Sequence, residues 1–249
     1  MRYSLVDGVR TEARPELSGH CQTCERPTIA RCGEIKIWHW AHKGKRLCDP
    51  WWENETEWHR AWKDKFPIDC QEIVHHDDSG EKHVADVKTE QEWVIEFQHS
   101  HIKPDERRAR NAFYKKLVWV VNGNRRLRDK PQFFESLNEL HPVHANPLIR
   151  KVYLEGCAIL RDWAGCPVPI FFDFGEEEVL WCLLPANQDM WGYVVAFSRT
   201  GFIQIHNASA GQPTKNFSDC MRELNTFVTQ RTLLDSKQRE ISALRVIHS

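Results

Sequence analysis

The chain of 249 residues is long enough for one large domain or two modest ones, and its composition of 41% hydrophobic and 28% charged residues is that of a soluble globular protein. It has no apolar run long enough to span a membrane, and its polar N-terminal stretch is not a signal peptide. The net charge of −1 excludes a general attraction of the whole molecule for polyanions, so any nucleic-acid site must be a local patch. We expect a cytoplasmic protein whose nine cysteines are metal ligands and buried thiols rather than disulfides.

A segment rich in Cys and His opens the chain. Cys21 and Cys24 have the CxxC spacing that presents two thiolates to one tetrahedral Zn²⁺, and a closed structural site needs two further ligands. Four candidates follow in the order of preference Cys48, His42, His39 and Cys32, the last of which lies in a strand-like run, TIARCGEIKIW. We predict a zinc-ribbon-like module over residues 1–49, with zinc held by Cys21, Cys24, His42 and Cys48. Buried thiols beside unrelated histidines are the alternative.

An aromatic helix is predicted next. Asp49 suits an N-cap and Pro50 suits the first helical position, and the helical pattern runs to about Lys65. One stripe of this helix holds four aromatic residues and one carboxylate: Trp51, Glu55, Trp58, Trp62 and Phe66. Glu55 therefore faces inward, where a charge is costly unless it is paired or bound to metal. His59 and Lys63 follow at intervals of one turn, and a Glu55–His59 pair that satisfies itself is the alternative.

Two short runs rich in β-branched residues, HVADV and WVIEF, lie within residues 82–100 and predict two strands of a hairpin, after a first strand near CQEIVHH. Asp86 lies in the first run, and Glu96 and Gln98 share one face of the second. If the strands pair, Asp86 and Glu96 converge, and two neighbouring carboxylates favour a hard cation such as Mg²⁺ between them. A solvated face of an antiparallel sheet is the alternative.

A basic helix, DERRARNAFYKKL, precedes LVWVVNG, a strand that is apolar on both faces. Residues 103–130 carry ten Lys or Arg against three acidic residues. Such a basic patch beside the carboxylates is typical of a site that binds phosphodiesters. A solvated helix face is the alternative. The candidate nucleic-acid contacts are Arg107, Arg108, Arg110, Tyr114 and Lys115.

The last part of the chain, residues 141–249, shows no chemistry above background, and we expect a β-rich accessory region for which a protein partner is a candidate role. After a short helix at PQFFESLNELH, five runs predict a strand meander: IRKVYLEG, PVPIFFDF, EEVLWCLL, WGYVVAFS and TGFIQIHN. A closing helix is predicted at FSDCMRELNTFVTQRTLLD, and the four widely spaced cysteines here are expected to be core thiols.

Four segments together resemble the competence protein CoiA-like group of predicted nucleases, within the PD-(D/E)XK phosphodiesterase superfamily: HWAH after the CxxC, ENETEWHRAWK, ADV…VIEFQHSHI, and RNAFY followed by VWVV. The resemblance covers roughly residues 20–123. It implies an α/β (α+β) fold with an αβββαβ core over residues 50–140. It also implies metal ligands at Asp86 and Glu96, a first-helix Glu55 accompanied by His59 and Lys63, a third active-site position at Gln98, and a matching helix pair, Arg110 and Tyr114.

The activity that this resemblance implies is hydrolysis of DNA with Mg²⁺ or Mn²⁺, in DNA uptake, recombination or defence. The chain departs from the wider superfamily at Gln98, where a Lys is usual, although an E-x-Q version is usual within the CoiA-like group. Because a Gln supplies no positive charge, Lys63, Lys88 or the metal would have to supply it. A nuclease-like protein that binds DNA or a recombination partner without cutting is the competing hypothesis, and RNA stays open as a substrate. Since close carboxylates repel, the sequence predicts that Asp86→Asn raises thermal stability in metal-free buffer.

Overall fold

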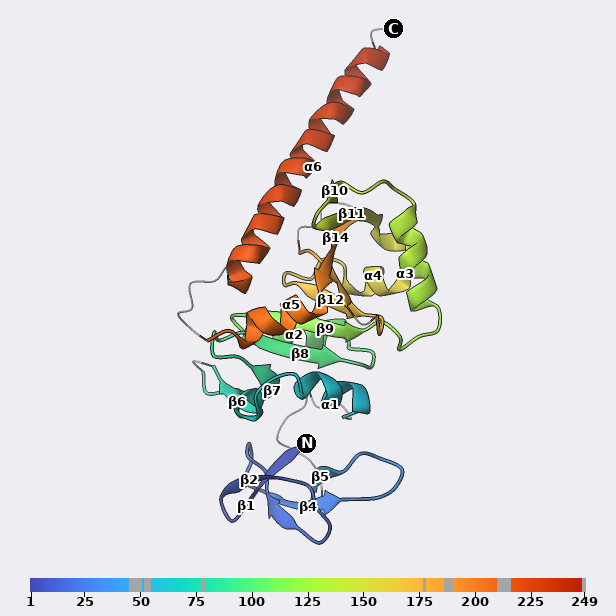
Figure 1. Ribbon diagram of the computed structural model, residues 1–249. Coiled ribbons are helices and arrows are strands. Elements are labelled where there is room, and N and C mark those ends of the chain that lie inside the picture. The colour runs from blue at the N-terminus through green and yellow to red at the C-terminus, as the bar shows by residue number, and fades with distance from the viewer. Residues whose placement is uncertain are drawn as a thin grey trace. The chain divides into compact units, whose positions relative to one another are not determined.

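The computed structural model (Figure 1) describes residues 1–44, 51, 55–77, 79–176, 178–185, 190–209 and 216–247. This part of the chain is mixed α/β and contains six α-helices. It forms two compact units, Met1–Asn122 with Asn207–Ala210, and Gly123–His206 with Gly211–Ser249. The domain boundaries expected near residues 49 and 140 stay predictions. Within the described ranges, no helix combines the length and the apolar character that crossing a membrane requires.

The first unit begins with a five-stranded antiparallel sheet in the order β2-β1-β3-β4-β5. Asp7 and Gly8 form the two-residue turn between β1 and β2, and both have the positive φ, 50° and 78°, that this turn favours. The strand predicted over TIARCGEIKIW ends early, because β4 stops at Arg31. The five strands are β1 (Tyr3–Val6), β2 (Val9–Glu12), β3 (Ser18–His20), β4 (Pro27–Arg31) and β5 (His39–His42).

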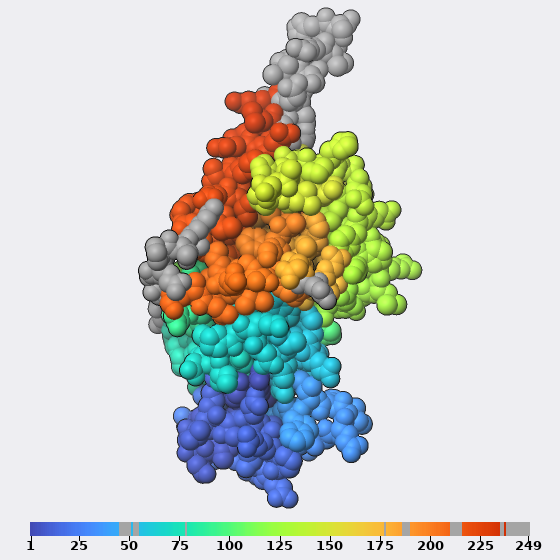
Figure 2. Space-filling view, viewed as in Figure 1, coloured from blue at the N-terminus to red at the C-terminus, as the bar shows by residue number. Residues whose placement is uncertain are grey.

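The rest of the first unit follows the predicted order of helix, three strands, helix and strand. Its elements are α1 (Glu57–Lys63), the 3-10 turn η1 (Ile68–Cys70), β6 (Gln71–His76), β7 (Lys82–Lys88), β8 (Val94–Gln98), α2 (Pro104–Phe113) and β9 (Leu117–Asn122). Strands β6, β7 and β8 pair antiparallel in chain order, and β9 pairs parallel with β8. All six residues of β9 are buried, as its apolar sequence predicts. Figure 2 shows the N-terminal sheet (blue) against the region of α1 and β6 (cyan), where Arg10 Nη1 donates to the Ile68 carbonyl at 2.8 Å.

Helix α1 is shorter than the helix predicted from the sequence. It begins at Glu57 because Thr56 caps it: Thr56 Oγ1 accepts from the His59 N–H at 3.3 Å, and His59 Nδ1 accepts from the Thr56 N–H at 3.2 Å. The predicted start at Asp49 and Pro50 lies outside the described residues. Three of the four aromatic residues of the predicted stripe have ring centroids 5.6 to 6.3 Å from that of Phe97 on β8: Trp58, Trp62 and Phe66. The fourth, Trp51, stacks on His83 instead, with ring centroids 3.3 Å apart.

The second unit contains antiparallel strands in the order β10-β11-β14-β13-β12. These are β10 (His144–Ala145), β11 (Leu148–Tyr153), β12 (Ile170–Asp173), β13 (Val179–Leu183) and β14 (Trp191–Ser198). The helical elements are α3 (Asp129–Asn138), η2 (Leu154–Gly156), α4 (Ala158–Trp163), α5 (Arg199–Asn207) and α6 (Phe217–Ile247). Four of the five predicted strands are present, together with the short helix near residue 131.

The prediction of a strand at TGFIQIHN is wrong, because these residues form helix α5. Ser198 Oγ accepts from the Gly201 N–H at 3.1 Å and so satisfies a donor at the start of the helix. Phe202 and His206, one helical turn apart, are both buried. The closing helix α6 is longer than predicted and runs to Ile247.

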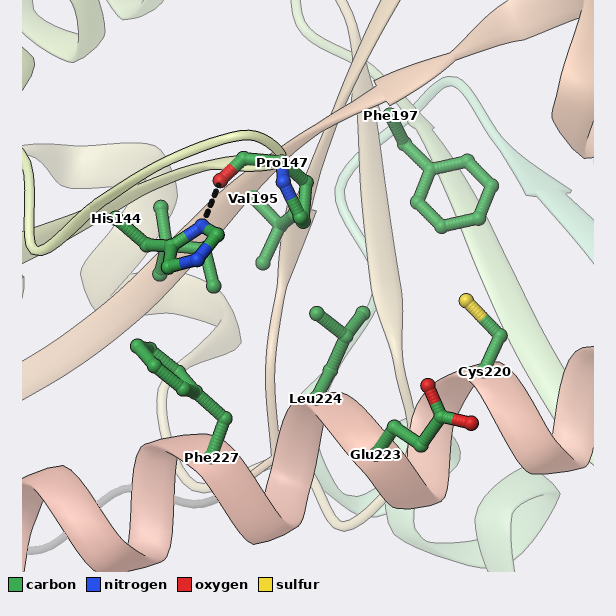
Figure 3. A pocket seen from close by; sticks show the side chains of 9 residues that line it. His144, Pro147, Val195, Phe197, Cys220, Glu223, Leu224 and Phe227 are labelled. Carbon is green, nitrogen blue, oxygen red and sulfur yellow. Dashed lines mark hydrogen bonds between the residues drawn. The ribbon is translucent and has the colours of Figure 1, made fainter.

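A cavity of about 400 Å³ lies in the second unit between the first turns of α6 and strands β11 and β14 (Figure 3). Its lining is mainly apolar, with Leu224 and Phe227 of α6 facing the strands. Two polar groups border it: Glu223, and His144, whose Nδ1 lies 2.9 Å from the Pro147 carbonyl oxygen. The cavity is shaped for an apolar group and includes none of the site residues predicted from the sequence.

Candidate active site and metal centre

The ammonium group of Lys63 lies among three carboxylates in the first unit. Lys63 Nζ is 3.0 Å from Glu72 Oε1, 3.2 Å from Glu55 Oε1 and 3.5 Å from Asp86 Oδ1. Lys63 is 3% exposed and ends α1, whereas the three acids come from the segment before α1, from β6 and from β7. We call these four residues the Lys63 cluster. It brings together three residues predicted from the sequence and one, Glu72, that was not.

Charge pairing sets the ionisation of the Lys63 cluster. Burial alone would lower the pKa of Lys63, but the carboxylates of Glu72, Asp86 and Glu55 hold that pKa well above its usual range. Burial would likewise raise the pKa of Glu72, yet the Lys63 ammonium, the N-terminal ammonium and the Arg2 N–H hold that pKa well below its usual range. The pKa of Glu55 is lowered in the same way, since Lys63 and Arg60 outweigh the effect of its burial. Lys63 and Arg60 together face three carboxylates, those of Glu55, Glu72 and Asp86, so the group keeps a net negative charge.

Glu55 is buried as the sequence predicted, although it precedes the helix instead of lying on it. Its side chain is 6% exposed and pairs with Arg60, whose Nη2 is 2.9 Å from Glu55 Oε2, as well as with Lys63. The sequence offered His59 as its partner. His59 instead accepts the Thr56 N–H at Nδ1, so its proton is assigned to Nε2, which donates to the Phe97 carbonyl at 3.0 Å. His59 thus ties α1 to β8.

Asp86 lies where β7 and β8 separate. The register pairs Val87 with Ile95 and Lys88 with Val94. Beyond the Val87–Ile95 pair, the Asp86 side chain replaces a main-chain acceptor of β7, and its Oδ2 accepts the Phe97 N–H at 3.0 Å. This hydrogen bond directs the other oxygen, Oδ1, toward Lys63.

Glu96 faces a different cation from Asp86. Arg110 Nη1 donates to Glu96 Oε2 at 2.8 Å, and the same guanidinium pairs with Glu106 and donates to the Trp51 carbonyl oxygen. Although burial lowers it, the pKa of Arg110 is raised overall by Glu96, Glu106 and Asp86. The two carboxylates expected to share one cation are therefore flanked by Lys63 and Arg110. Gln98, on the same strand as Glu96, is buried and its Nε2 donates to the Ser100 carbonyl at 3.1 Å.

The predicted nucleic-acid contacts divide into buried and exposed residues. Arg110 and Tyr114 are 7% and 3% exposed, and Arg110 is engaged by Glu96, so both belong to the interior of the unit. Arg107 is half-buried, whereas Arg108 and Lys115 are exposed. Arg108 forms a surface ion pair with Asp105. The exposed part of the predicted patch is therefore smaller than the sequence indicated.

The donor set of the Lys63 cluster is of the kind that Mg²⁺ and Mn²⁺ prefer, because carboxylate oxygens converge on a single point. That point is the position of Lys63 Nζ, which lies within 3.5 Å of one oxygen from each of Glu55, Glu72 and Asp86. The cluster thus offers ligands of the type that a hard divalent cation prefers, but Lys63 Nζ holds the point on which they converge. Glu72 was missed from the sequence because a single Glu in a strand-like run carries no signal.

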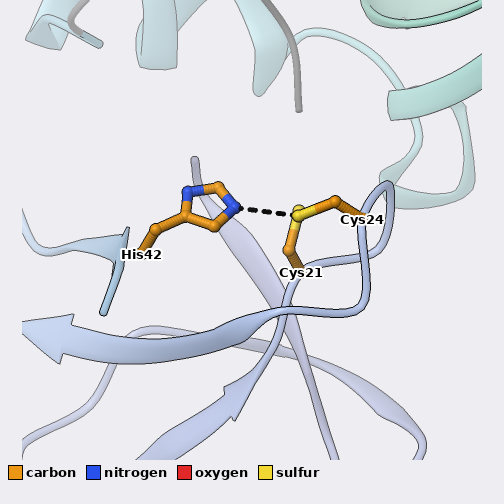
Figure 4. A group of neighbouring side chains, drawn as sticks. All are labelled: Cys21, Cys24 and His42. Carbon is orange, nitrogen blue, oxygen red and sulfur yellow. Dashed lines mark hydrogen bonds between the residues drawn. The ribbon is translucent and has the colours of Figure 1, made fainter. Parts of the chain in front are cut away.

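A second group of candidate ligands lies in the N-terminal sheet (Figure 4). The ligand atoms of Cys21, Cys24 and His42 all lie within 4.8 Å of one another, and Cys24 Sγ is 3.3 Å from His42 Nε2. Among the described residues, this is the group of three or more Cys, His, Asp or Glu side chains whose ligand atoms gather so closely. Two thiolates and an imidazole suit a structural metal ion, whose identity the ligands alone do not fix.

The local backbone explains why these three side chains meet. The Thr23 N–H points at Cys21 Sγ at 3.4 Å, and the Glu25 N–H donates to the Cys21 carbonyl at 2.9 Å, which bends the CxxC into a tight knuckle. His42 ends β5 beside it. His39, three positions earlier, points to the opposite face of that strand, and its Nδ1 is 2.9 Å from the Ile37 carbonyl oxygen. Cys48, the preferred fourth ligand, lies outside the described residues.

No protein-family model, curated protein or solved structure matches this chain. Its function is therefore inferred from the geometry of its own side chains.

Proposed function

We propose that this protein is a Mg²⁺- or Mn²⁺-dependent nuclease that hydrolyses DNA phosphodiester bonds, with a PD-(D/E)XK-like core resembling that of the CoiA-like group. The observation that supports the proposal is the Lys63 cluster, in which Lys63 Nζ lies 3.5 Å from Asp86 Oδ1 and 3.2 Å from Glu55 Oε1. Three carboxylates gathered around Lys63 and Arg60, two of them buried, cost stability that a purely structural role does not require. The order of elements from α1 to β9, helix, three strands, helix and strand, is the αβββαβ order of that superfamily.

In this proposal Asp86 and Glu96 hold the catalytic metal, and Glu55 assists as a direct ligand or through a bound water. A divalent ion there would polarise the scissile phosphate and lower the pKa of a bound water. Lys63 offsets charge that develops on the phosphate, which a neutral Gln98 cannot do. Gln98 orients the attacking water or a phosphate oxygen. His59 has a positioning role, since its hydrogen bond to the Phe97 carbonyl holds α1 against the strand that carries Glu96.

The nucleic acid would be held by the exposed basic residues around α2. Arg108 and Lys115 are exposed and Arg107 is half-buried, so they are available to phosphates, and Arg110 supports the site from within through Glu96. Zn²⁺ at Cys21, Cys24 and His42, with Cys48 as the proposed fourth ligand, would stabilise the N-terminal sheet. A role in DNA uptake, recombination or defence fits such an activity, and RNA is the alternative substrate. A protein partner for residues 141–249 is part of the same proposal.

The deciding experiment is a cleavage time course on labelled single-stranded DNA, duplex DNA and RNA with Mg²⁺ or Mn²⁺. The wild type is compared with Asp86→Ala/Glu96→Ala and with Glu135→Ala/Glu139→Ala, a control that removes two exposed acidic side chains outside the site. We expect cleavage by the wild type and by the control, and none by Asp86→Ala/Glu96→Ala. Equal cleavage by all three proteins would assign the activity to a contaminant and refute the proposal.

A nuclease-like protein that binds DNA without cutting it is the second candidate. It is favoured by the pairing of the acidic residues with basic side chains. Glu96 lies 2.8 Å from Arg110, and Lys63 occupies the point on which the other carboxylates converge. Under this hypothesis the wild type binds DNA and leaves it whole with both metals.

A further inference from the structure

The backbone of Glu72 is unusual for its position. Five non-glycine residues in the described chain have positive φ, and four of them, Asp7, Glu16, Glu25 and Glu92, are exposed. Glu72 is 6% exposed, lies inside β6 and has a φ of 44°. Residues in a β-strand normally have negative φ, and a positive φ strains a residue that carries a Cβ. Such strained residues are typical of functional sites, where the surroundings hold a side chain in place.

The strained backbone directs the Glu72 carboxylate between α1 and β1. On one side it accepts the Arg2 N–H at 2.8 Å and 3.0 Å and the Tyr3 N–H at 3.2 Å. On the other side Lys63 Nζ donates to its Oε1 at 3.0 Å. Along β6, Gln71 pairs with Val87 and Ile73 with Ala85, so Glu72 lies at the level of Asp86 on the neighbouring strand.

Two main-chain donors fix Glu72, the N–H groups of Arg2 and Tyr3, whereas Asp86 accepts one such bond, from Phe97. Arg2 and Tyr3 stand at the start of β1, which is held between β2 and β3 in the N-terminal sheet. Their N–H groups cannot change rotamer. Glu55 shares its carboxylate with the side chain of Arg60, and Asp86 is 25% exposed. The Lys63 side chain, with its flexible four-carbon stem, therefore takes its position from Glu72.

We propose that Glu72 is a positioning residue that holds the Lys63 ammonium in the cluster, and that the N-terminal sheet completes the site by anchoring Glu72 through the Arg2 and Tyr3 N–H groups. The significance of this arrangement rests on the proposed function, in which Lys63 supplies the positive charge that Gln98 lacks. The N-terminal sheet would then be part of the catalytic apparatus as well as a carrier of the Cys21–Cys24–His42 group. Met1 connects the two sites, because Cys21 Sγ lies 3.9 Å from its Sδ, one residue before Arg2.

The test measures acylation of individual lysines by mass spectrometry, on folded full-length protein without metal or nucleic acid. In the wild type we expect Lys63 to be protected and the exposed Lys115 to react. Glu72→Gln should raise the rate of Lys63 acylation about tenfold or more, because the carboxylate nearest the ammonium loses its charge. The matched control is Glu92→Gln, which also removes a positive-φ Glu that pairs with a lysine, Lys88, at 2.8 Å. It should leave Lys63 protected.

A second variant covers the case in which Glu72→Gln does not fold. Glu72→Asp keeps the charge but is one methylene too short to reach both the β1 N–H groups and Lys63, so we expect it to fold and to raise Lys63 acylation by a smaller factor. Protection of Lys63 equal to that of the wild type, in either folded variant, would overturn the proposal.

Cleavage assays separate this inference from the proposed function. If the wild type cleaves DNA, Glu72→Gln should lower kcat with little change in KM, because Lys63 is displaced while the exposed DNA contacts remain. Increased acylation in a protein that never cleaves would retain the positioning role and refute the nuclease. If folded Glu72→Gln cleaves DNA at the wild-type rate and its Lys63 stays protected from acylation, the nuclease proposal is retained and the positioning role of Glu72 is refuted.

Discussion

The Asp86 carboxylate lies 3.5 Å from the Lys63 ammonium, and this contact reverses the effect expected of its neutralisation. If repulsion between carboxylates were the dominant interaction, Asp86→Asn should stabilise the metal-free protein. Since Lys63 stands between Asp86 and the other acids, the same change removes an attraction, and we expect a loss of about 1 kcal/mol in the free energy of unfolding. Thermal unfolding in a chelating buffer measures it.

Mg²⁺ or Mn²⁺ should then raise the melting temperature of the wild type and leave that of Asp86→Asn unchanged, because a ligand stabilises only the protein that binds it. Asp105→Asn is the control, since Asp105 pairs with Arg108 at the surface. A melting temperature of Asp86→Asn above that of the wild type in chelator would show that repulsion between carboxylates dominates the site.

The buried position of Arg110 changes which substitutions test nucleic-acid binding. Arg108→Glu/Lys115→Glu alters two exposed residues and should weaken binding and reduce the slope of log K against log salt by about 2. Reversal of Arg110 would leave Glu96 beside a second carboxylate in the interior and destabilise the fold, so it does not report on binding. Arg14→Glu/Arg31→Glu, at two exposed positions of the N-terminal region, changes the net charge by the same amount and is the control. Unchanged binding by the double variant would exclude this face of α2.

The Cys21–Cys24–His42 group predicts a metal content for the purified protein. We expect about one equivalent of zinc, which Cys21→Ser/Cys24→Ser should lose together with the fold of the N-terminal sheet. Cys70→Ser is the matched control, because Cys70 lies in η1 outside the N-terminal sheet, and Cys48→Ser asks whether Cys48 supplies the fourth ligand. Elemental analysis and thermal unfolding give the result, and a metal-free wild type as stable as the double variant would remove the site.

The sequence predicted best where side-chain periodicity determines the structure. Trp58, Trp62 and Phe66 recur at helical spacing and all reach Phe97, so the inward position of Glu55 followed from them even though its backbone is not helical. The knuckle at Cys21 and Cys24 was predictable for a similar reason, since two residues between cysteines leave few geometries.

Contacts that depend on main-chain conformation left no such pattern. The role of Glu72 follows from a positive φ and from N–H groups of Arg2 and Tyr3, some 70 residues away, which no local pattern encodes. In TGFIQIHN the alternation of apolar and polar residues favoured a strand. The burial of Phe202 with His206 and the cap at Ser198 show that tertiary packing selected a helix there.

His206 predicts a pH dependence that belongs to the second unit. It is 2% exposed, its ring centroid lies 4.3 Å from that of Phe202 and 4.4 Å from that of Phe217, and its Nδ1 is 2.8 Å from the Phe202 carbonyl oxygen. Burial lowers the pKa of His206 to about 4, and the hydrogen bond to Phe202 opposes this only in part. The unfolded chain, with an ordinary His pKa of about 6.5, binds more protons between these values.

Stability from His206 is therefore fully present above about pH 6.5 and is lost as the pH falls toward 4, by on the order of 3 kcal/mol at the lower limit. His206→Gln keeps an N–H donor for the Phe202 carbonyl but does not titrate, so its free energy of unfolding should fall less than that of the wild type between pH 7 and pH 4. Urea unfolding across this range compares the two, with His141→Gln, at an exposed position, as the control. Because carboxylates titrate equally in all three proteins, parallel pH profiles for the wild type and His206→Gln would mean that the buried imidazole is protonated in the folded state and that the ring-packed site tolerates its charge.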